Sequence, residues 1–249
     1  MRYGICPISI APLRLETSDA SEMVSQVLYG EIFKILESRK KWSKIRLAHD
    51  KYEGWIDNKQ FTEIEAEEYH SLLDKEHVFS NDLIAHLTHQ DHTLSTVTIG
   101  AQVSSSIFLK DSFQIDQSKG IKNKTQLVDN ALLFLNTPYL WGGRSPLGID
   151  CSGFTQLIYR LNGYQLLRDA SEQATQGEVL SFIEESEPGD LAFFDNNEGK
   201  ITHVGIIMSD NYIIHAHGKV RIDRLDQSGI FNMDKNIHTH KLRVIKKIL

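Results

Sequence analysis

One cysteine and two histidines in this sequence have the residue types and the order expected of a thiol-based catalytic site. Cys151 lies in the run Gly-Ile-Asp-Cys-Ser-Gly-Phe, directly before apolar residues at helical spacing. His203 and His215 follow in two segments with strand character, Thr-His-Val-Gly-Ile-Ile and Tyr-Ile-Ile-His-Ala. A cysteine nucleophile needs a nearby base, and a third group usually orients that base. The three residues therefore predict attack of a thiolate on an acyl bond.

A helix that starts at Cys151 is expected to favour the reactive thiolate. A free thiol is mostly protonated at neutral pH, and the partial positive charge of a helix N-terminus stabilises its anion. Ser152 and Gly153 are small enough to leave the sulfur accessible, and a backbone N–H near Cys151 can donate to a developing oxyanion. His203 is the predicted general base. His215 is predicted to orient it, because a hairpin would bring the two imidazoles together.

The other histidines near these two leave alternatives open. His217 lies two residues after His215 and would share its face of a strand, so spacing alone allows either ring to be the orienting group. His203 and His215 could also be ordinary strand residues with local hydrogen bonds. His238 and His240, near the C-terminus, are expected at the surface.

A third group of histidines, His86, His89 and His92, has a spacing that a metal site could use. Two histidines three residues apart share a helix face, but a third at i+6 points away from them. Asp91 is the only nearby carboxylate, and it is poorly placed as a fourth ligand. We therefore predict no metal and no other cofactor.

The composition is that of an ordinary globular protein, with 249 residues, 41% hydrophobic residues and a formal net charge of −6. The negative charge argues against nucleic acid or an anionic membrane as a partner. The two cysteines, Cys6 and Cys151, form no disulfide framework and fit a reducing compartment, with Cys6 expected as a small buried residue. The N-terminus lacks a leader-like apolar run and no segment approaches a membrane span, so we expect a cytoplasmic protein.

The pattern of apolar residues divides the chain into three predicted parts. Residues 1–66 alternate at period two between turn residues, which predicts a small β-barrel. Residues 67–120 are expected to form a second, shorter β-module, polar and helix-compatible over 67–90 and strand-like over 93–116. The polar stretch 118–124 is the predicted linker. Residues 121–249 carry helical patterns first and strands afterwards, an α+β arrangement.

Five segments in the second half, in their order and spacing, resemble the NlpC/P60 family of cysteine peptidases. The segments are Pro138–Phe154, Leu167–Gln173, Glu187–Phe194, His203–Gly205 and Ile214–Ala216. The resemblance implies a papain-like α+β fold and a Cys-His-His triad of Cys151, His203 and His215. It also implies that Tyr139 directs its hydroxyl toward the oxyanion, although Tyr139 could instead pack beneath the turn that follows it.

The first part of the chain resembles a bacterial SH3-like domain. The resemblance rests on Ala11–Arg14, Ser25–Gln26, Tyr29–Glu31, Trp42 and Asp50–Trp55. One group of NlpC/P60 peptidases carries two such modules before the catalytic domain. It cleaves the γ-D-glutamyl link to L-lysine or diaminopimelate in cell-wall peptides with a free N-terminal L-Ala. The resemblance thus implies one or two SH3-like β-barrels, a murein peptide as substrate and a role in peptidoglycan recycling.

A free ammonium that enters a partly closed site needs carboxylate partners. Asp150, beside the nucleophile, is the first candidate, and Ser152 is a neutral acceptor, although Asp150 could instead cap the helix. We expect the SH3-like module to add Tyr52 and an acidic residue, with Glu16 as the first choice. The acidic alternatives in that module are Glu22 and Glu53.

Two other functions fit parts of this pattern. The chain could be a cell-wall peptide-binding protein whose papain-like domain is inert, although the intact set of Cys151, His203 and His215 argues against it. It could also be a related papain-like amidase or acyltransferase acting on another acyl bond.

Overall fold

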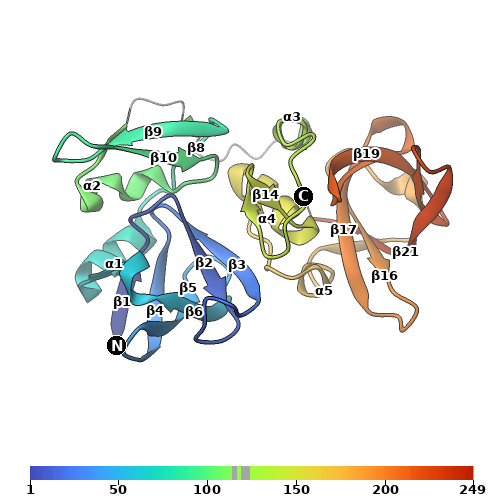
Figure 1. The fold of residues 1–249 in the computed structure, drawn as a ribbon. Helices are drawn as coiled ribbons and strands as arrows, with labels where there is room; N and C mark the ends of the chain where they lie inside the picture. Colours follow the sequence, from blue (N-terminus) through green and yellow to red (C-terminus); the bar gives the residue numbers. More distant parts are fainter. Residues whose placement is uncertain (114–116, 119–123, 249) are drawn as a thin grey trace. The chain divides into compact units, whose positions relative to one another are not determined.

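The computed structural model describes residues 1–113, 117–118 and 124–248, which form two compact units (Figure 1). The first unit comprises Met1–Ile121 and Trp141–Pro146, and the second comprises Lys122–Leu140 and Leu147–Leu249. Most of the predicted linker 118–124 and the end of the predicted strand segment 93–116 lie outside the described residues. No described helix is long and apolar enough to cross a membrane.

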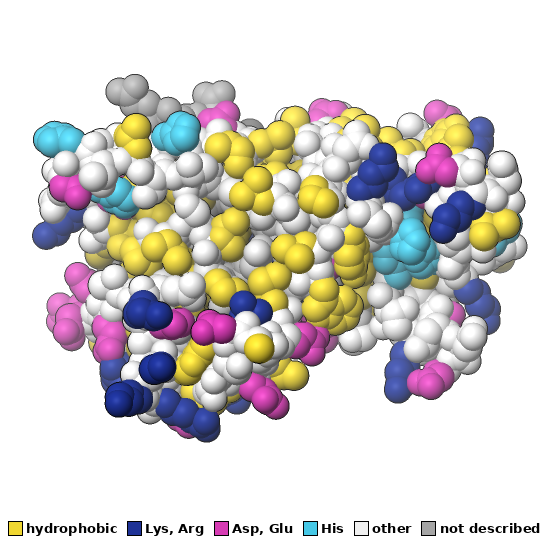
Figure 2. Space-filling view, in the orientation of Figure 1, with side chains coloured by type: hydrophobic (Ala, Val, Ile, Leu, Met, Phe, Trp, Pro, Cys, Tyr) yellow, Lys and Arg dark blue, Asp and Glu magenta, His cyan; other side chains and the backbone are white. Residues whose placement is uncertain are grey.

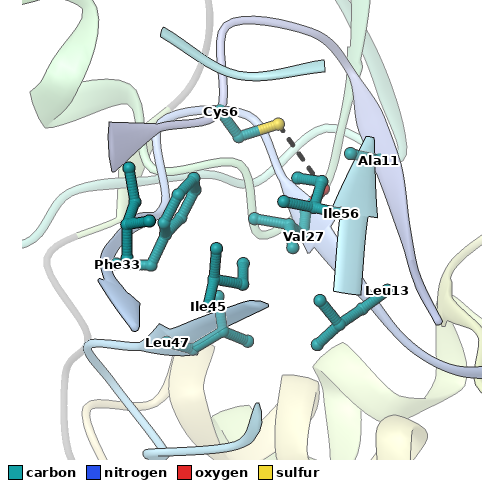
Figure 3. Packing of buried hydrophobic residues seen from close by; sticks show 9 residues of the cluster. Cys6, Ala11, Leu13, Val27, Phe33, Ile45, Leu47 and Ile56 are labelled. Carbon is teal, nitrogen blue, oxygen red and sulfur yellow. Dashed lines mark hydrogen bonds between the residues drawn. The ribbon is translucent and has the colours of Figure 1, made fainter. Parts of the chain in front are cut away.

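The first unit begins with a small antiparallel β-barrel, as the alternating pattern predicted. Its strands follow the order β3-β2-β6-β5-β4-β1-β7. They are β1 (Arg2–Ile5), β2 (Ile10–Arg14), β3 (Met23–Leu28), β4 (Ile32–Ser38), β5 (Trp42–Leu47), β6 (Glu53–Asp57) and β7 (Thr62–Ile64), with a 3-10 turn at Asn58–Gln60. Inward residues such as Leu13, Phe33 and Ile45 form its core (Figure 3). Cys6 packs there, and burial raises the pKa of its thiol to about 12, which makes it an inert packing residue.

A second β-module follows the barrel, but its helices and strands differ from those predicted. The elements are α1 (Ala66–Asp74), β8 (Phe79–Ser80), β9 (Ile84–Thr88), β10 (Leu94–Thr98), a 3-10 turn at Val103–Ser105, α2 (Ser106–Leu109), β11 (Ser112–Phe113) and β12 (Gln117–Ser118). The helix-compatible reading of 67–90 is wrong from Phe79 onward, because Ala85 and Leu87 alternate inward on a strand. The strand reading of 93–116 is wrong over the turn and α2. His89, one of the three histidines considered as metal ligands, forms hydrogen bonds with Asp111 and Ser95.

The second unit places helices before an antiparallel sheet, as the α+β pattern predicted. Its sheet order is β15-β21-β16-β17-β18-β19-β20, and β21 also pairs with β20, so the sheet closes on itself. The helices are α3 (Lys124–Leu132), α4 (Cys151–Leu161) and α5 (Ala170–Gln173), with 3-10 turns at Ile183–Glu185 and Ser209–Asn211. The strands are β14 (Gly148–Ile149), β15 (Glu178–Leu180), β16 (Leu191–Asp195), β17 (Ile201–Met208), β18 (Tyr212–His217), β19 (Lys219–Asp226), β20 (Gly229–Asn232) and β21 (Ile237–Lys247).

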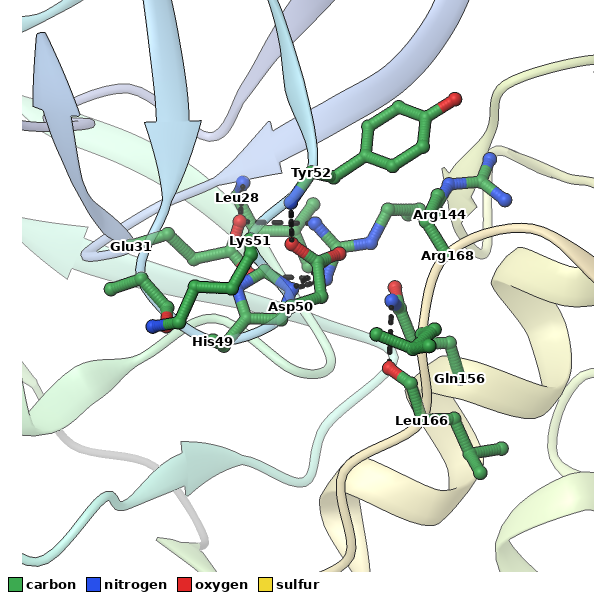
Figure 4. A network of polar contacts seen from close by, with 12 residues as sticks. Leu28, Glu31, His49, Asp50, Lys51, Tyr52, Arg144, Gln156, Leu166 and Arg168 are labelled. Carbon is green, nitrogen blue, oxygen red and sulfur yellow. Dashed lines mark hydrogen bonds and ion pairs between the residues drawn. The ribbon is translucent and has the colours of Figure 1, made fainter. Parts of the chain in front are cut away.

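The short segment Trp141–Pro146, which contains β13 (Arg144–Ser145), is held in the first unit by a buried ion pair. The Arg144 guanidinium donates to both carboxylate oxygens of Glu31 at 3.0 Å, and Arg144 also bonds the backbone and side chain of Gln26 (Figure 4). Both charged side chains are almost fully buried. Gly142 has a φ of +75°, and a Cβ there would lie 2.2 Å from the carbonyl oxygen of Met23, so no larger residue fits.

We expect Arg144→Ala to lower the free energy of unfolding of the first unit by about 3–5 kcal/mol, because it leaves the Glu31 carboxylate buried and unpaired. Urea unfolding followed by tryptophan fluorescence measures this, since Trp42, Trp55 and Trp141 all belong to that unit. Lys59→Ala, which removes an exposed ammonium paired with Asp57, is the matched control and should change stability by less than about 1 kcal/mol. Equal effects of the two substitutions would contradict the structural role of Arg144.

Candidate active site

Cys151 is the first residue of α4, at the helix start that the sequence predicted. The helix begins there because Asp150 adopts an extended conformation and its Oδ1 accepts a hydrogen bond from the backbone N–H of Gly153 at 2.6 Å. Phe154 donates its backbone N–H to the Asp150 carbonyl. The capping role considered for Asp150 is therefore present in the structure.

The sulfur of Cys151 lies against the backbone of β17, near Thr202 and Val204, the two residues that flank His203 in the sequence. Its distance to the carbonyl oxygen of Thr202 is 4.0 Å, and the backbone N–H groups of Val204 and Ser152 face it. Burial, together with the nearby Asp150 carboxylate, raises the pKa of the Cys151 thiol to about 12, and these N–H groups offset only part of that rise. Burial therefore outweighs the backbone N–H groups and favours the neutral thiol.

His203 and His215 are joined by a hydrogen bond of 2.8 Å between Nε2 of His203 and Nδ1 of His215. The hairpin of β17 and β18 pairs Gly205 with His215, and His203 lies two residues from Gly205 on the same face. A Cβ at Gly205 would lie 2.8 Å from the Cβ of His215, so glycine at this position leaves space for the two rings. The structure thus brings together the predicted base and the group predicted to orient it.

Asp223 on β19 extends this pair of rings and was missed in the sequence. Nε2 of His215 lies 3.1 Å from Oδ2 of Asp223, and both side chains are fully buried. Arg221 donates to both carboxylate oxygens of Asp223, and the backbone N–H of Met233 donates to Oδ1. The period-two pattern of β19, with Asp223 and Leu225 on one face, is the sequence signal that could have found it.

The charges of these groups follow from their surroundings. Burial, with smaller contributions from neighbouring histidines, lowers the pKa of His203 well below its usual value. Burial also lowers the pKa of His215, against the opposing effect of Asp223. Burial alone would raise the pKa of Asp223, but hydrogen bonds from His215 and Arg221 hold it below its usual value. At neutral pH the site therefore contains two neutral imidazoles beside a carboxylate.

His240 is half-buried rather than fully exposed at the surface. Its ring stacks on that of His203 with centroids 4.2 Å apart, because β21 closes the sheet beside β20 and β16. His217 is exposed, and its ring centroid lies 6.3 Å from that of His203, so it makes no direct contact that would replace His215. His238 is exposed, as expected, and pairs with Asp226. Figure 2 shows histidine side chains gathered on the surface of the second unit.

Tyr139 lies beside the nucleophile. Burial, followed by the nearby Cys151 and Asp150 side chains, raises the pKa of its phenol above its usual value, so it remains a hydrogen-bond donor. The backbone of Tyr139 bonds the carbonyl of Gly218 and bridges to Ile149, which fixes the start of the loop before α4.

The carboxylate of Asp150 already has a cation partner. Arg168 donates to both of its oxygens, at 3.0 and 2.6 Å, and also to Oγ of Ser152 at 3.0 Å. Arg168 is buried and was not singled out in the sequence. The bidentate pair holds the residues on either side of Cys151 in one geometry.

These motifs and their geometry agree with comparisons with known proteins. Residues 136–238 match the model of the NlpC/P60 family, and residues 13–61 match that of the bacterial dipeptidyl-peptidase Sh3 domain. The second unit carries an NlpC/P60 domain. A crystal structure of an NlpC/P60 family protein from Bacillus cereus ATCC 10987 has the same fold, with a TM-score of 0.79 and 20% identity over 99% of both chains. The predicted fold class, an NlpC/P60 domain preceded by an SH3-like β-barrel, is confirmed.

Curated relatives of this chain include two dipeptidyl-peptidases. The γ-D-glutamyl-L-lysine dipeptidyl-peptidase of Bacillus subtilis (strain 168) is 39% identical over 43% of this chain and 36% of its own length. The dipeptidyl-peptidase 6 of Lysinibacillus sphaericus is 26% identical over 88% of this chain and 90% of its own length. The alignment thus spans little more than a third of the Bacillus subtilis protein.

The residues predicted outside the NlpC/P60 domain lie in the first unit. Tyr52 is half-buried against the barrel core, and Glu16 is exposed. Of the acidic alternatives, Glu22 accepts a hydrogen bond from Trp141, and Glu53 is paired with Lys44 and Arg46. Their roles in substrate binding remain predictions.

We expect kcat/KM for peptide hydrolysis to stay high at pH 6 and to fall only in more acidic solution. His203 acts as a base only when neutral, and its lowered pKa keeps it neutral below pH 6.5. A pH profile of kcat/KM, with circular dichroism to confirm folding at each pH, measures the acid limb. An acid limb at or above pH 6.5 would contradict the buried, neutral state of His203.

Proposed function

We propose that this chain is a cysteine peptidase that hydrolyses the γ-D-glutamyl-L-diamino acid bond of cell-wall peptides with a free N-terminal L-Ala. The observation that carries the proposal is the buried hydrogen bond between His203 and His215 on β17 and β18, with the Cys151 sulfur at the start of α4 lying 4.0 Å from the carbonyl oxygen of Thr202, the residue before His203. The names of the relatives support the bond and the diamino acid. The SH3 match supports the same class of dipeptidyl-peptidase.

The geometry suits acylation of the thiol by the γ-glutamyl carbonyl. His203 takes the thiol proton as the sulfur attacks, because neither group is ionised beforehand. The phenol of Tyr139 donates a hydrogen bond to the oxyanion. The imidazolium of His203 then protonates the departing amine of the diamino acid. A water molecule, deprotonated by the same imidazole, releases the dipeptide L-Ala-D-Glu and restores the thiol.

The enzyme recognises the N-terminal end of its peptide substrate by the free amine of L-Ala. We propose that Asp150 and Ser152 bind it from the NlpC/P60 domain, with Tyr52 and Glu16 contributed by the SH3-like barrel. The Asp150 carboxylate is already paired with the Arg168 guanidinium, so a second carboxylate is required to balance the charge of the substrate ammonium. Glu16 carries no ion pair among the described residues and is exposed, which leaves its charge available.

A cavity beside His203 suits the diamino acid that leaves. The departing amine takes its proton from His203, so this part of the substrate must lie next to that ring. The cavity, of about 450 Å³, is lined by Thr202, the sequence neighbour of His203, by His240, whose ring stacks on that of His203, and by Asp195 and Lys241. Oδ1 of Asp195 is buried without a hydrogen-bond partner among the described residues, while its Oδ2 lies 3.8 Å from Nε of Arg243. A carboxylate and an ammonium match the ammonium and carboxylate of a C-terminal diamino acid.

We further propose that the enzyme acts in the cytoplasm on imported muropeptides, as part of peptidoglycan recycling. The requirement for a free L-Ala amine supports this role, because that amine is exposed only after the glycan strand has been removed from the peptide. The two cysteines, both unpaired and buried, also fit a reducing compartment.

We expect L-Ala-γ-D-Glu-L-Lys to be hydrolysed to L-Ala-D-Glu and L-Lys, and N-acetylation of the L-Ala to lower kcat/KM about 100-fold, because a buried charge pair is lost. Mass spectrometry of the products measures both reactions. Cys151→Ala should abolish hydrolysis while keeping the circular dichroism of the wild type. Binding of the tripeptide without turnover would favour a non-catalytic binding protein, and formation of transfer products without free acid would favour an acyltransferase.

We expect the tripeptide ending in norleucine, which lacks only the side-chain ammonium, to have a kcat/KM about tenfold lower than the lysine tripeptide. Asp195→Asn should remove most of this preference, because it removes the charge that faces the ammonium. Asp129→Asn, an exposed position on α3, is the matched control and should keep the preference. A preference for lysine that survives in Asp195→Asn would exclude this cavity as the binding site.

A further inference from the structure

We propose that Asp223 is a positioning residue that sets the tautomers of both imidazoles, so that Nδ1 of His203 is the basic nitrogen at the thiol. The inference rests on the proposed function for its effect on turnover. It goes further by assigning a role to a residue on β19 that does not touch the substrate.

The first step concerns the charge of Asp223. Its two oxygens accept from three donors, which are Nε and Nη2 of Arg221 and the backbone N–H of Met233, and Oδ2 also lies 3.1 Å from Nε2 of His215. The guanidinium of Arg221 donates to both oxygens, and this paired geometry with a cation favours the charged carboxylate over the neutral acid. The side chain is therefore an ionised carboxylate that only accepts hydrogen bonds.

The second step passes from the carboxylate to the rings. Because Asp223 only accepts, Nε2 of His215 must carry a hydrogen. A neutral imidazole has one N–H and one bare nitrogen, so Nδ1 of His215 is bare. That nitrogen lies 2.8 Å from Nε2 of His203, which must then donate to it. The remaining nitrogen of His203, Nδ1, is left without a hydrogen and can accept the proton of the thiol.

The other charged and titratable groups around the two rings do not determine which ring nitrogens carry the hydrogens. His240 on β21 stacks on His203 face to face, and the ring centroid of His217 on β18 lies 6.3 Å from each ring. Arg221 is occupied by Asp223 and by Asp234, at 3.0 Å. Among the described residues, Asp223 is the group that accepts a hydrogen bond from Nε2 of His215.

The substitution Asp223→Asn tests the tautomers rather than the packing alone. The amide oxygen would stay where Oδ1 accepts from two donors, Met233 and Nη2 of Arg221, so the amide nitrogen takes the position of Oδ2, where it opposes the single donor Nε of Arg221. There it donates to Nε2 of His215 and reverses both rings. Nδ1 of His203 then carries a hydrogen and cannot accept the proton of Cys151, although the contacts between β18 and β19 remain.

We expect Asp223→Asn to lower kcat on the order of 100-fold or more with little change in KM, as expected when a base is held in the wrong tautomer. Asp223→Glu should recover part of kcat, since it restores an acceptor. Asp234→Asn is the control, because it removes the other, exposed carboxylate at Arg221 and should leave kcat within about twofold. A kcat of Asp223→Asn close to that of the wild type would overturn the proposal.

Nitrogen-15 NMR of the imidazole rings gives a readout that does not depend on turnover. In the wild type, Nε2 of both His203 and His215 should carry the hydrogen, and in Asp223→Asn the hydrogen should lie on Nδ1 of both. A wild-type spectrum with Nδ1–H on either ring would overturn the proposal, even if the variant failed to fold. A wild type that shows the expected tautomers but cleaves no peptide would instead reject the proposed function and leave the tautomer assignment in place.

Discussion

The hydrogen bond between His203 and His215 is the interaction on which the site depends. It exists because β17 and β18 pair in the register that places Gly205 opposite His215. His203 lies two residues before Gly205 and therefore on the same face of the sheet. A shift of one residue would turn one of the rings to the other face of the sheet. The same register leaves the backbone around His203 facing the sulfur of Cys151. The base and the orienting group are therefore consequences of one strand pairing, while the start of α4 places the nucleophile.

Buried arginines that pair with carboxylates recur in both units. Arg144 meets Glu31 in the first unit, and Arg168 meets Asp150 beside the nucleophile. Pairs of this kind gain little net stability, because removing both charges from water offsets their attraction. They hold polar groups in one geometry, since the planar guanidinium accepts only a narrow set of carboxylate positions. The loop before α4 and the start of α4 are both fixed in this way.

Burial also decides how the thiol is activated. The helix start and the backbone N–H groups favour a thiolate at Cys151, but the dry surroundings favour the neutral thiol and the second effect is larger. The same surroundings keep His203 neutral. A proton transfer between two neutral groups fits this site better than a permanent ion pair. Such a site requires a base with the correct nitrogen exposed, which makes the tautomer of His203 important.

The sequence by itself determined the local features of this protein. A capped helix start at Cys151, strand alternation around His203 and His215, and the barrel of residues 1–66 all follow from short-range patterns, and the family motifs match the same segments. Only the tertiary structure decided the partners of those residues. Asp223, Arg168, Arg144 and His240 come from elements whose neighbours are set by sheet closure and loop packing. Sequence spacing predicts which face a side chain occupies, but contacts between distant strands depend on how the whole sheet pairs.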